Sequence, residues 1–246
     1  PYMMASRKEF PVVVGKDRIR AGRTAVETLG CNVIILDDGF QHIRLERDVN
    51  LLLMDSSDPV GNGRLLPSGR LREDPAAALA RADGLIFTRA EGRTAQRFDD
   101  PFIEAAAEGI PRFTCGHVPY PAFRVLKESA EKDEMIPDLA DFKGRSVLLF
   151  SGIAKNDAFY RSIESAGAHI KAHLEFNDHY RYKEADIKQI NRLAVKVEAE
   201  QIVTTEKDWA RLNTAAGWQA DLAVIGIDIR FRDPAGFQSF LEDKLF

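Results

Sequence analysis

Short apolar runs alternate with amphipathic stretches along most of this chain. Runs rich in Val, Ile and Leu predict buried strands, because a strand covered on both faces is apolar throughout. The predicted strands are residues 10–15, 32–36, 49–55, 84–88, 112–116, 146–150, 170–176, 201–204 and 222–227. The predicted helices are residues 18–29, 75–82, 101–108, 157–166, 184–200 and 234–245. This alternation predicts an α/β fold, with a parallel sheet covered by helices on both faces.

The alternation lapses once, between residues 119 and 142. A charge-rich run at residues 127–133, with prolines on either side, predicts an inter-domain connector that could carry a β-hairpin. The predicted organisation is therefore a core at residues 1–118, a linker at 119–142 and a smaller C-terminal α/β domain at 143–246.

Composition narrows the class of protein. The 246 residues are 45% hydrophobic, enough for one large core or two smaller ones. The net charge of −4 gives no indication of a general nucleic-acid binder. A transmembrane helix needs about 18 consecutive apolar residues, and no apolar run in the sequence is that long. Cys31 and Cys115 lie in apolar runs without metal-type spacing, so we expect reduced thiols.

Two adjacent carboxylates follow the predicted strand at residues 32–36. In open α/β sheets, ligands bind beyond the carboxyl ends of the strands, where Asp37 and Asp38 stand. Two neighbouring carboxylates repel each other and lose hydration unless a cation or a donor meets them. Mg²⁺ on a nucleotide phosphate is a common cation of this kind. An Asp-Asp-Gly turn that ends a loop is an equally open alternative.

A segment rich in glycine and arginine follows further along the chain. Gly61-Asn-Gly63-Arg64-Leu-Leu-Pro67-Ser-Gly69-Arg70-Leu-Arg72-Glu73 comes after a predicted strand that ends at Asp55. Guanidinium groups suit phosphate oxygens, so this segment predicts a bound anion, with Glu73 opening the next helix. The alternative is a basic surface loop with a helix-capping glutamate.

Polar segments also follow predicted strands elsewhere. Asn177-Asp178-His179-Tyr180 offers a histidine that could act as a general base near neutral pH, or could be structural. Thr204-Thr205-Glu206-Lys207-Asp208 has the composition of a helix N-cap. Val14-Gly15-Lys16-Asp17-Arg18 adds two cations at a helix start, which is a weaker indication.

The phosphate-binding pattern G-x-x-x-x-G-K-[ST] does not occur in the 246 residues. Three hypotheses therefore stay open. The chain could be the incomplete body of a kinase, or a non-catalytic module that binds a nucleotide or a lipid headgroup. It could also be a metal-dependent phosphotransferase of another fold that uses the Asp pair as nucleophile and base, which leaves the Gly-Arg segment unexplained.

Taken in order, these segments resemble the tetraacyldisaccharide 4′-kinase family, the lipid A 4′-kinases of Gram-negative bacteria. The matching motifs are Val14-Gly-Lys-Asp-Arg18, Asp37-Asp-Gly-Phe-Gln-His42, Arg47-Asp48, Gly61-x-Gly63 with Leu65-Leu-Pro67-x-Gly69-x-Leu-Arg72-Glu73, Arg81-Ala-Asp83, Ser151-Gly-Ile-Ala154, Asp178-His-Tyr180 and Thr205-Glu-Lys-Asp208. They occur in the family's order and span nearly the whole chain.

The resemblance implies a P-loop-NTPase-like kinase core and a smaller C-terminal α/β domain, joined by a β-stranded linker. It implies Mg²⁺-dependent transfer of the ATP γ-phosphate to the 4′-hydroxyl of a lipid A disaccharide 1-phosphate. The implied location is the cytoplasmic face of the inner membrane. The implied partners are ATP, this lipid precursor and the membrane surface, with no nucleic acid among them.

The family's site residues carry over onto matching positions of this sequence. Asp37 and Asp38 match its strand-end acids, with catalytic and metal-binding roles, and Glu73 matches its magnesium-side glutamate. His179 matches the histidine that partners a catalytic aspartate. The positions implied near the nucleotide or the anionic substrate are Arg18, Gln41 and Arg72.

The sequence departs from the family pattern at its beginning. Family members carry, ahead of what is Pro1 here, a membrane-associating segment, the Walker A loop and a Gly-Asp-Glu motif with the aspartate that pairs with His179. Pro1 resembles the residue directly after that motif, so the P-loop and the first strand of the sheet are expected to be absent from this chain. We therefore expect little or no kinase activity, and marginal stability or aggregation, from the isolated chain.

Overall fold

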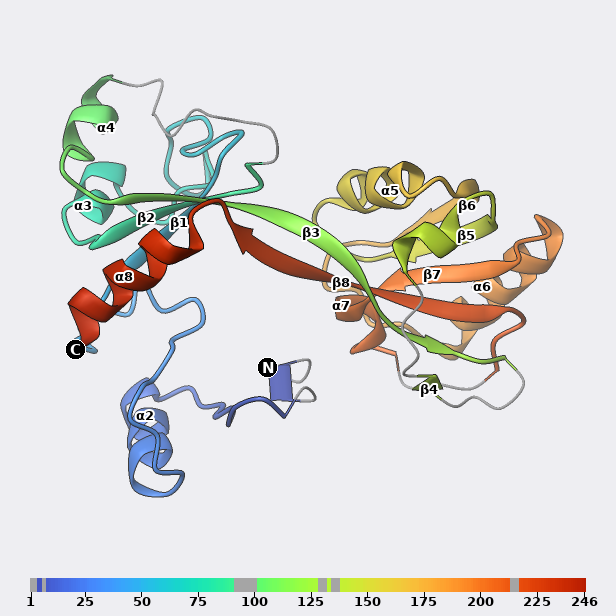
Figure 1. Cartoon of the computed structure of the whole chain (residues 1–246), viewed down its shortest axis with the longest axis horizontal. Helices are drawn as coiled ribbons and strands as arrows, with labels where there is room; N and C mark the ends of the chain where they lie inside the picture. The colour runs from blue at the N-terminus through green and yellow to red at the C-terminus, as the bar shows by residue number, and fades with distance from the viewer. Residues whose placement is uncertain (1–3, 6–7, 91–100, 128–131, 134–137, 213–216) are drawn as a thin grey trace. The chain divides into compact units, whose positions relative to one another are not determined.

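The computed structural model describes residues 4–5, 8–90, 101–127, 132–133, 138–212 and 217–246 (Figure 1). The chain splits into two compact units. Unit 1 comprises Pro1–Val12 and Pro119–Asp228, and unit 2 comprises Val13–Val118 and Ile229–Phe246. Each unit is made of two separate stretches of the sequence, whereas each predicted domain is one continuous range. The predicted domain boundaries stay a prediction.

Unit 1 is built on parallel strands (Figure 1). The strands are β5 (Ser146–Ser151), β6 (His169–Glu175), β7 (Gln201–Thr205) and β8 (Asp221–Phe231), paired in the order β8-β7-β5-β6. The short β4 (Lys132–Asp133) pairs antiparallel with the end of β3 (Arg112–Val125). The helical segments of unit 1 are η1 (Leu139–Phe142), α5 (Asn156–Ser165), α6 (Glu184–Lys196) and α7 (Glu206–Trp209).

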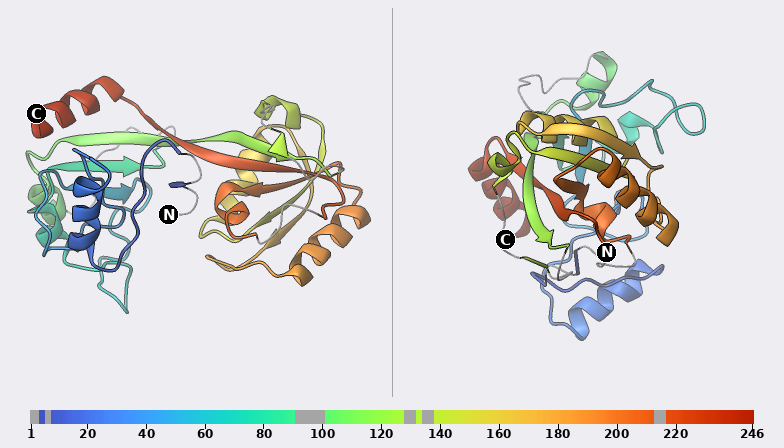
Figure 2. Two further views of the ribbon diagram at one scale, coloured as in Figure 1. Left: turned by 90° about the horizontal axis from the view of Figure 1, so that it is seen from below. Right: turned by 90° about the vertical axis from the view of Figure 1, so that its right-hand side faces the viewer.

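The central strand β5 is buried on both faces. Val147 and Leu149 pack in the apolar cluster that includes residues of α5. Leu148 and Phe150 pack in a second cluster that includes residues of α6. Figure 2 shows the two helices on opposite faces of the strands. Successive side chains of a strand point to opposite faces, so a strand between two helical layers must be apolar throughout, as this one is.

Unit 2 has a smaller parallel sheet. Its strands β1 (Leu51–Asp55), β2 (Gly84–Thr88) and the first part of β3 pair in the order β1-β2-β3. The helices are α2 (Arg18–Glu27), α3 (Pro75–Leu79), α4 (Pro101–Ala106) and α8 (Pro234–Leu245). The buried core of this unit consists of Met54, Leu79, Leu85, Phe87, Ile103 and Ala107.

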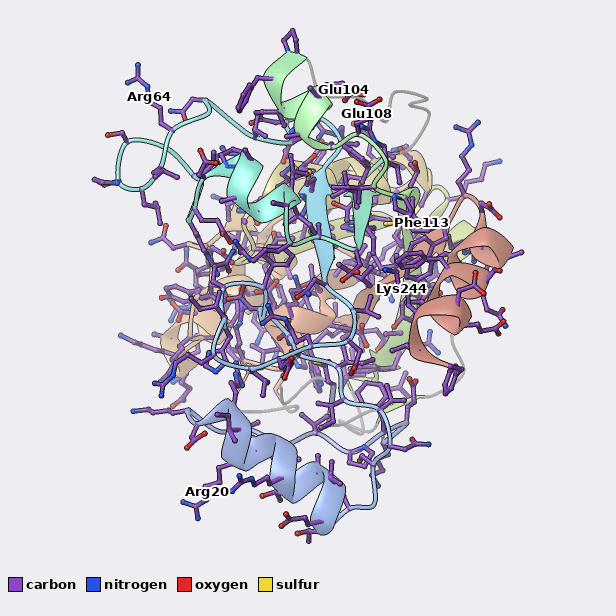
Figure 3. All side chains as sticks on the ribbon, turned by 90° about the vertical axis from the view of Figure 1, so that its left-hand side faces the viewer. Arg20, Arg64, Glu104, Glu108, Phe113 and Lys244 are labelled. Carbon is purple, nitrogen blue, oxygen red and sulfur yellow. The ribbon has the colours of Figure 1, made fainter. Side chains whose placement is uncertain are left out.

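Helix α8 packs in unit 2 although it follows the strands of unit 1 in the sequence. The rings of Phe237 and Phe240 lie 4.9 and 5.1 Å from the ring of Phe113 on β3. Figure 3 shows Phe113 and Lys244 at this helix. The Lys244 ammonium group contacts the Asp83 carboxylate at 2.9 Å. Aromatic packing and an ion pair therefore hold α8 in this unit.

The predicted α/β class with a mostly parallel sheet is confirmed, and β2 has the predicted bounds. The P-loop-type core stays a prediction. The predicted strands at residues 10–15 and 32–36 are wrong: within the described residues neither segment forms a strand, and Ile35 is 90% exposed. An apolar run favours a strand, but a strand also needs a neighbour that satisfies its backbone groups.

The described residues include no helix with the length and apolar character that a membrane span requires. Both cysteines are free thiols: Cys115 is buried, as predicted, whereas Cys31 is half-buried.

Candidate functional site

A tight turn carries the first of the predicted site residues. Asp38 adopts the left-handed conformation with φ of 52°, and Gly39 follows it. A Cβ atom on Gly39 would lie 2.6 Å from the Cβ of Leu36, so only glycine fits there. The Asp-Asp-Gly turn considered from the sequence is therefore present.

This turn meets the end of the Gly-Arg segment in unit 2. Nη1 of Arg72 donates to both carboxylate oxygens of Asp38, at 2.8 and 3.0 Å. Nε2 of Gln41 donates to Oε1 of Glu73 at 3.0 Å, and Nη2 of Arg81 donates to Oε2 of Glu73 at 2.6 Å. We call these five residues the unit 2 cluster. Asp38, Gln41, Arg72 and Glu73 are predicted site positions, and Arg81 belongs to one of the family motifs. Asp38 on the turn and Arg72 on the segment lie 34 positions apart in the sequence.

The Asp38–Arg72 pair of the unit 2 cluster is open to solvent, whereas the Glu73–Arg81 pair is half-buried. The side chains of Arg72 and Asp38 are 56% and 66% exposed. Each carboxylate of the cluster already has a guanidinium partner, so the local charges are balanced without a ligand. An exposed ion pair of this kind is weak, because water competes for both groups. A phosphate group could therefore displace Asp38 from Arg72 at little cost.

Backbone contacts hold the loops that carry the cluster. Nη1 of Arg47 donates to the carbonyl oxygens of Gly39 and His42, at 3.1 and 2.8 Å. In the Gly-Arg segment, Nδ2 of Asn62 donates to the carbonyl oxygen of Ser68 at 2.9 Å. The expected helix start at Glu73 is wrong, because Asp74 caps α3 by accepting a hydrogen bond from the backbone N–H of Ala77 at 3.0 Å.

Two predicted positions have other surroundings. Arg18 begins α2, and its guanidinium group donates to the carbonyl oxygen of Gly15 at 3.4 Å. Asp37 is the exposed first residue of the turn. No group of three or more metal-ligating side chains is found within the described ranges. The roles predicted for Asp37, Asp38, Glu73, Arg18, Gln41 and Arg72 stay predictions.

The sequence reasoning did not identify an ion pair at the ends of β1 and β2. Nη1 of Arg89 donates to Oδ2 of Asp55 at 2.8 Å, and the hydroxyl group of Ser57 donates to Oδ1 at 2.6 Å. Asp55 is the last residue of β1. The sequence signal that could have identified Asp55 is an acid at the carboxyl end of an apolar strand, because ligands bind at that edge of a parallel sheet.

In unit 1 three segments that end or follow parallel strands meet around one buried carboxylate. Asp208 is 0% exposed. Its Oδ1 accepts hydrogen bonds from the backbone N–H of Gly152 and the hydroxyl group of Tyr182, both at 3.0 Å. Its Oδ2 accepts one from the hydroxyl group of Thr205 at 2.6 Å. Gly152 directly follows β5, Thr205 ends β7, and Tyr182 lies in the loop between β6 and α6, so Asp208 ties these three segments together.

Arg211 connects this carboxylate to His179. Nη1 of Arg211 lies 3.6 Å from Oδ1 of Asp208 and donates to the carbonyl oxygen of Gly152 at 2.9 Å. Nη2 of Arg211 lies 3.2 Å from Nδ1 of His179. We call Gly152, His179, Asp208 and Arg211 the unit 1 network. It brings together the Ser-Gly-Ile-Ala, Asp-His-Tyr and Thr-Glu-Lys-Asp motifs that the sequence shows only as separate segments.

His179 lies on a loop that aromatic rings hold in place. The residue has φ of 61°, a conformation that non-glycine residues adopt rarely and that often marks functional positions. The rings of Phe176, Tyr180 and Tyr182 pack against one another in tilted and edge-to-face contacts, with centroids 4.8 to 5.4 Å apart. Burial and the neighbouring Asp208 raise the pKa of Tyr182, so its hydroxyl group stays a donor.

The N-cap interpretation of the Thr-Glu-Lys-Asp segment is confirmed. The Thr205 side chain accepts a hydrogen bond from the backbone N–H of Asp208 at 3.1 Å and caps α7. The part of Asp208 in the unit 1 network was not predicted, because the network depends on contacts between segments that are distant in the sequence. Arg211 was not considered from the sequence at all.

Comparison with known proteins gives consistent matches. The family model described as LpxK, tetraacyldisaccharide-1-P 4′-kinase, matches residues 1–246. The tetraacyldisaccharide 4′-kinase of Desulfatibacillum aliphaticivorans is 37% identical over 251 residues, covering 100% of this chain and 65% of that protein. The enzyme of the same name from Syntrophus aciditrophicus is 37% identical, covering 96% of this chain and 63% of that protein.

A solved structure matches as well. The crystal structure of LpxK from Aquifex aeolicus in complex with ATP superposes with a TM-score of 0.65 at 26% identity. The match covers 95% of this chain and 64% of that one. This chain thus spans about 65% of the length of the relatives that it matches.

Proposed function

The chain belongs to the tetraacyldisaccharide-1-P 4′-kinase family, and we propose that it carries part of the machinery of that phosphoryl transfer. The proposed reaction moves the γ-phosphate of ATP to the 4′-hydroxyl group of a tetraacyldisaccharide 1-phosphate, at the cytoplasmic face of the inner membrane. The activity, the lipid substrate and the membrane surface as partner are proposals for this chain, because it spans only part of its relatives.

The unit 2 cluster is the observation that carries this proposal. Phosphoryl transfer is catalysed mainly by positioning and by stabilising charge on the transferring group. Arg72 offers a guanidinium group for phosphate oxygens, and its partner Asp38 is exposed and exchangeable. Gln41 donates to Glu73 and so fixes the orientation of that carboxylate. The cluster can therefore exchange its internal ion pair for contacts with an anion.

The donor set of the cluster fits Mg²⁺. This ion prefers carboxylate oxygens and is commonly bound through one or two carboxylates together with substrate phosphates. Asp38 and Glu73 supply such oxygens from facing loops, and Asp37 adjoins them. A bound Mg²⁺ would neutralise charge on the transferring phosphoryl group. In the proposed site Asp38 and Glu73 would hold the ion, with Asp37 next to them in the sequence, and Arg72, once released from Asp38, would bind a phosphate oxygen.

His179 and Arg18 have separate proposed roles. We assign His179 to the catalytic machinery through its contact with the unit 1 network, which fixes one of its ring nitrogens. We assign Arg18 to binding of the nucleotide or the anionic substrate, because its guanidinium group makes one long contact, to the Gly15 carbonyl oxygen at 3.4 Å, and can be recruited.

A second candidate function is binding of the nucleotide or of the lipid headgroup without turnover. The observation that favours it is the sequence itself, in which the pattern G-x-x-x-x-G-K-[ST] does not occur. That pattern cradles the β- and γ-phosphates in P-loop enzymes. We therefore propose that this chain alone turns over ATP slowly or not at all.

Binding and turnover of Mg-ATP by the full 246-residue chain test both candidates. We expect measurable Mg-ATP binding by calorimetry, weakened about 10-fold to 100-fold in Arg72→Met, because a charged hydrogen bond is lost. Arg20→Met is the matched control, since Arg20 is an exposed arginine of unit 2 that projects from α2 (Figure 3).

Turnover is measured as transfer of labelled phosphate to tetraacyldisaccharide 1-phosphate. Binding without transfer supports the second candidate. Transfer as fast as in a full-length relative contradicts the proposal of slow turnover. If Mg-ATP does not bind, or if Arg72→Met and Arg20→Met bind it equally, the assignment of the unit 2 cluster is wrong.

A further inference from the structure

The contact between Arg211 and His179 fixes where the imidazole proton sits. A guanidinium group has only N–H donors and stays charged at any accessible pH. Its Nη2 lies 3.2 Å from Nδ1 of His179, so Nδ1 must present a lone pair rather than a proton. The proton of the neutral ring therefore lies on Nε2.

Arg211 is itself held firmly. Its side chain is 20% exposed, with Nη1 donating to the carbonyl oxygen of Gly152 at 2.9 Å and lying 3.6 Å from Asp208. Asp208 is 0% exposed and accepts three further hydrogen bonds. A buried carboxylate with this many donors is fixed in place, and it restrains the guanidinium group that faces it.

Gly152 makes this arrangement possible. Its backbone N–H donates to Asp208 and its carbonyl oxygen accepts from Arg211. A Cβ atom at this position would lie 3.1 Å from the carbonyl oxygen of Asn177 and 3.2 Å from Oδ1 of Asp208. These contacts are tight, so a residue with a Cβ atom requires its neighbours, the Asp208 carboxylate among them, to shift.

We propose that Arg211 is a positioning residue for His179, and that it holds the imidazole in the tautomer with the proton on Nε2. The proposal rests on the function proposed above for the importance that it gives to His179. The chain of contacts runs from the buried Asp208 through Arg211 to a side chain that is 82% exposed. An exposed ring without such a contact would exchange between tautomers, so the contact selects one of them.

The selected tautomer limits the chemistry of His179. Nε2–H can donate to an anionic oxygen, and Oδ2 of Asp178 at 3.7 Å is the described carboxylate nearest to this role. The general base predicted from the sequence would need a lone pair on Nε2 instead. Our proposal thus makes the neutral ring of His179 a hydrogen-bond donor to a carboxylate or a phosphate oxygen.

The test is the tautomer of His179 in the full chain. Proteins labelled with ¹⁵N at histidine give long-range ¹H–¹⁵N correlation spectra in which protonated and unprotonated ring nitrogens have distinct shifts. Spectra at about pH 9, well above the ordinary histidine pKa near 6.5, report on neutral rings. His179→Gln assigns the signal among the five histidines of the chain.

We expect the wild-type spectrum to show Nδ1 of His179 as an unprotonated nitrogen and Nε2 as a protonated one. In Arg211→Met we expect both shifts to move to intermediate values, as in a mixture of tautomers. Arg192→Met is the matched control, because Arg192 is an exposed residue of α6 outside the network, and it should leave the His179 signal unchanged.

Two results would overturn the proposal. One is a wild-type spectrum in which Nδ1 carries the proton, which is decisive even if Arg211→Met fails to fold. The other is a folded Arg211→Met variant with the wild-type shifts. The measurement uses neither ATP nor lipid, so its failure and the failure of the proposed function are distinguishable.

Discussion

The unit 1 network and the unit 2 cluster combine arginines with carboxylates in opposite ways. In unit 1 the central acid, Asp208, is fully buried, and its hydrogen bonds come from the strand ends of a parallel sheet. In unit 2 the acid Asp38 is 66% exposed, and its arginine is nearly as open to water. The buried group is positioned before any ligand arrives, whereas the exposed pair is free to exchange partners. In our proposal the buried carboxylate helps to position a neighbouring side chain, and the exposed pair binds an anion.

Replacing Asp208 should give the largest effect on stability. Asp208→Ala leaves the N–H of Gly152 and the hydroxyl group of Tyr182 without their acceptor in a buried place. We expect the free energy of unfolding of unit 1 to fall by about 3 kcal/mol. Urea unfolding followed by tryptophan fluorescence measures it, because both tryptophans of the chain, Trp209 and Trp218, lie in unit 1.

Asp157→Ala is the matched control for that measurement. Asp157 pairs with Arg161 on the surface of α5, and both side chains are 66% exposed. Its loss should change the free energy of unfolding much less than the loss of Asp208, because water screens an exposed ion pair. Equal effects of the Asp208 and Asp157 variants would contradict the contrast between buried and exposed acids.

Gly152→Ala should come next in size. The added Cβ atom would lie 3.1 Å from the Asn177 carbonyl oxygen and 3.1 Å from the Cβ of Tyr180. We expect a loss of about 1–3 kcal/mol, because a well-packed site must shift to admit the methyl group. The same urea titration checks it. An unchanged midpoint would show that the strand ends are not held as rigidly as the network requires.

Unit 1 should also lose stability in acid through His173. Burial lowers the pKa of His173 below its ordinary value near 6.5, and the carboxylate of Glu175, 3.7 Å away, partly opposes the shift. The folded chain therefore favours the neutral ring, and the unfolded chain binds more protons in this pH range. Stability is full above about pH 6.5 and falls as the pH drops towards the lowered pKa.

The slope of this loss is at most about 1.4 kcal/mol per pH unit for one proton. His173→Gln should flatten the dependence of the urea midpoint on pH between about 6.5 and 5. His169→Gln is the control, because His169 is the exposed histidine at the start of β6. If both variants keep the wild-type slope, another group causes the acid sensitivity.

The smallest effect is expected in unit 2. Asp38→Asn and Arg72→Gln break an exposed ion pair, so each should change the free energy of unfolding by less than about 1 kcal/mol. Thermal unfolding followed by far-ultraviolet circular dichroism measures this in a unit without tryptophan. A loss above about 2 kcal/mol would mean that this pair holds the fold, and its proposed freedom to exchange partners would be lost.

The strands could be predicted from the sequence where burial on both faces requires apolar residues. Residues 84–88 and 146–150 are apolar because helices cover them, and the structure has strands there. The run at residues 32–36 is just as apolar, yet within the described part of the chain it forms no strand. Pairing is a property of two segments, and one sequence pattern describes only one of them.

The site could be predicted residue by residue but not as a set of contacts. Asp38 and Arg72 were both candidates, yet no local pattern indicates that they pair across 34 positions. Asp208 lies in a segment with the composition of a helix N-cap, and Thr205 of that segment does cap α7. Its larger role comes from burial against Tyr182 and Gly152, which is decided by the packing of distant segments.

The return of α8 to unit 2 has a consequence for the order of synthesis. Residues 13–118 leave the ribosome before the strands β5 to β8 of unit 1, and Phe237 and Phe240, which pack on Phe113, leave it after those strands. The packing of unit 2 is therefore incomplete until α8 has been synthesised, whereas the strands of unit 1 can pair earlier. A nascent chain halted before residue 229 would hold a finished sheet in one unit and uncovered aromatic surface in the other, which is what a chaperone binds.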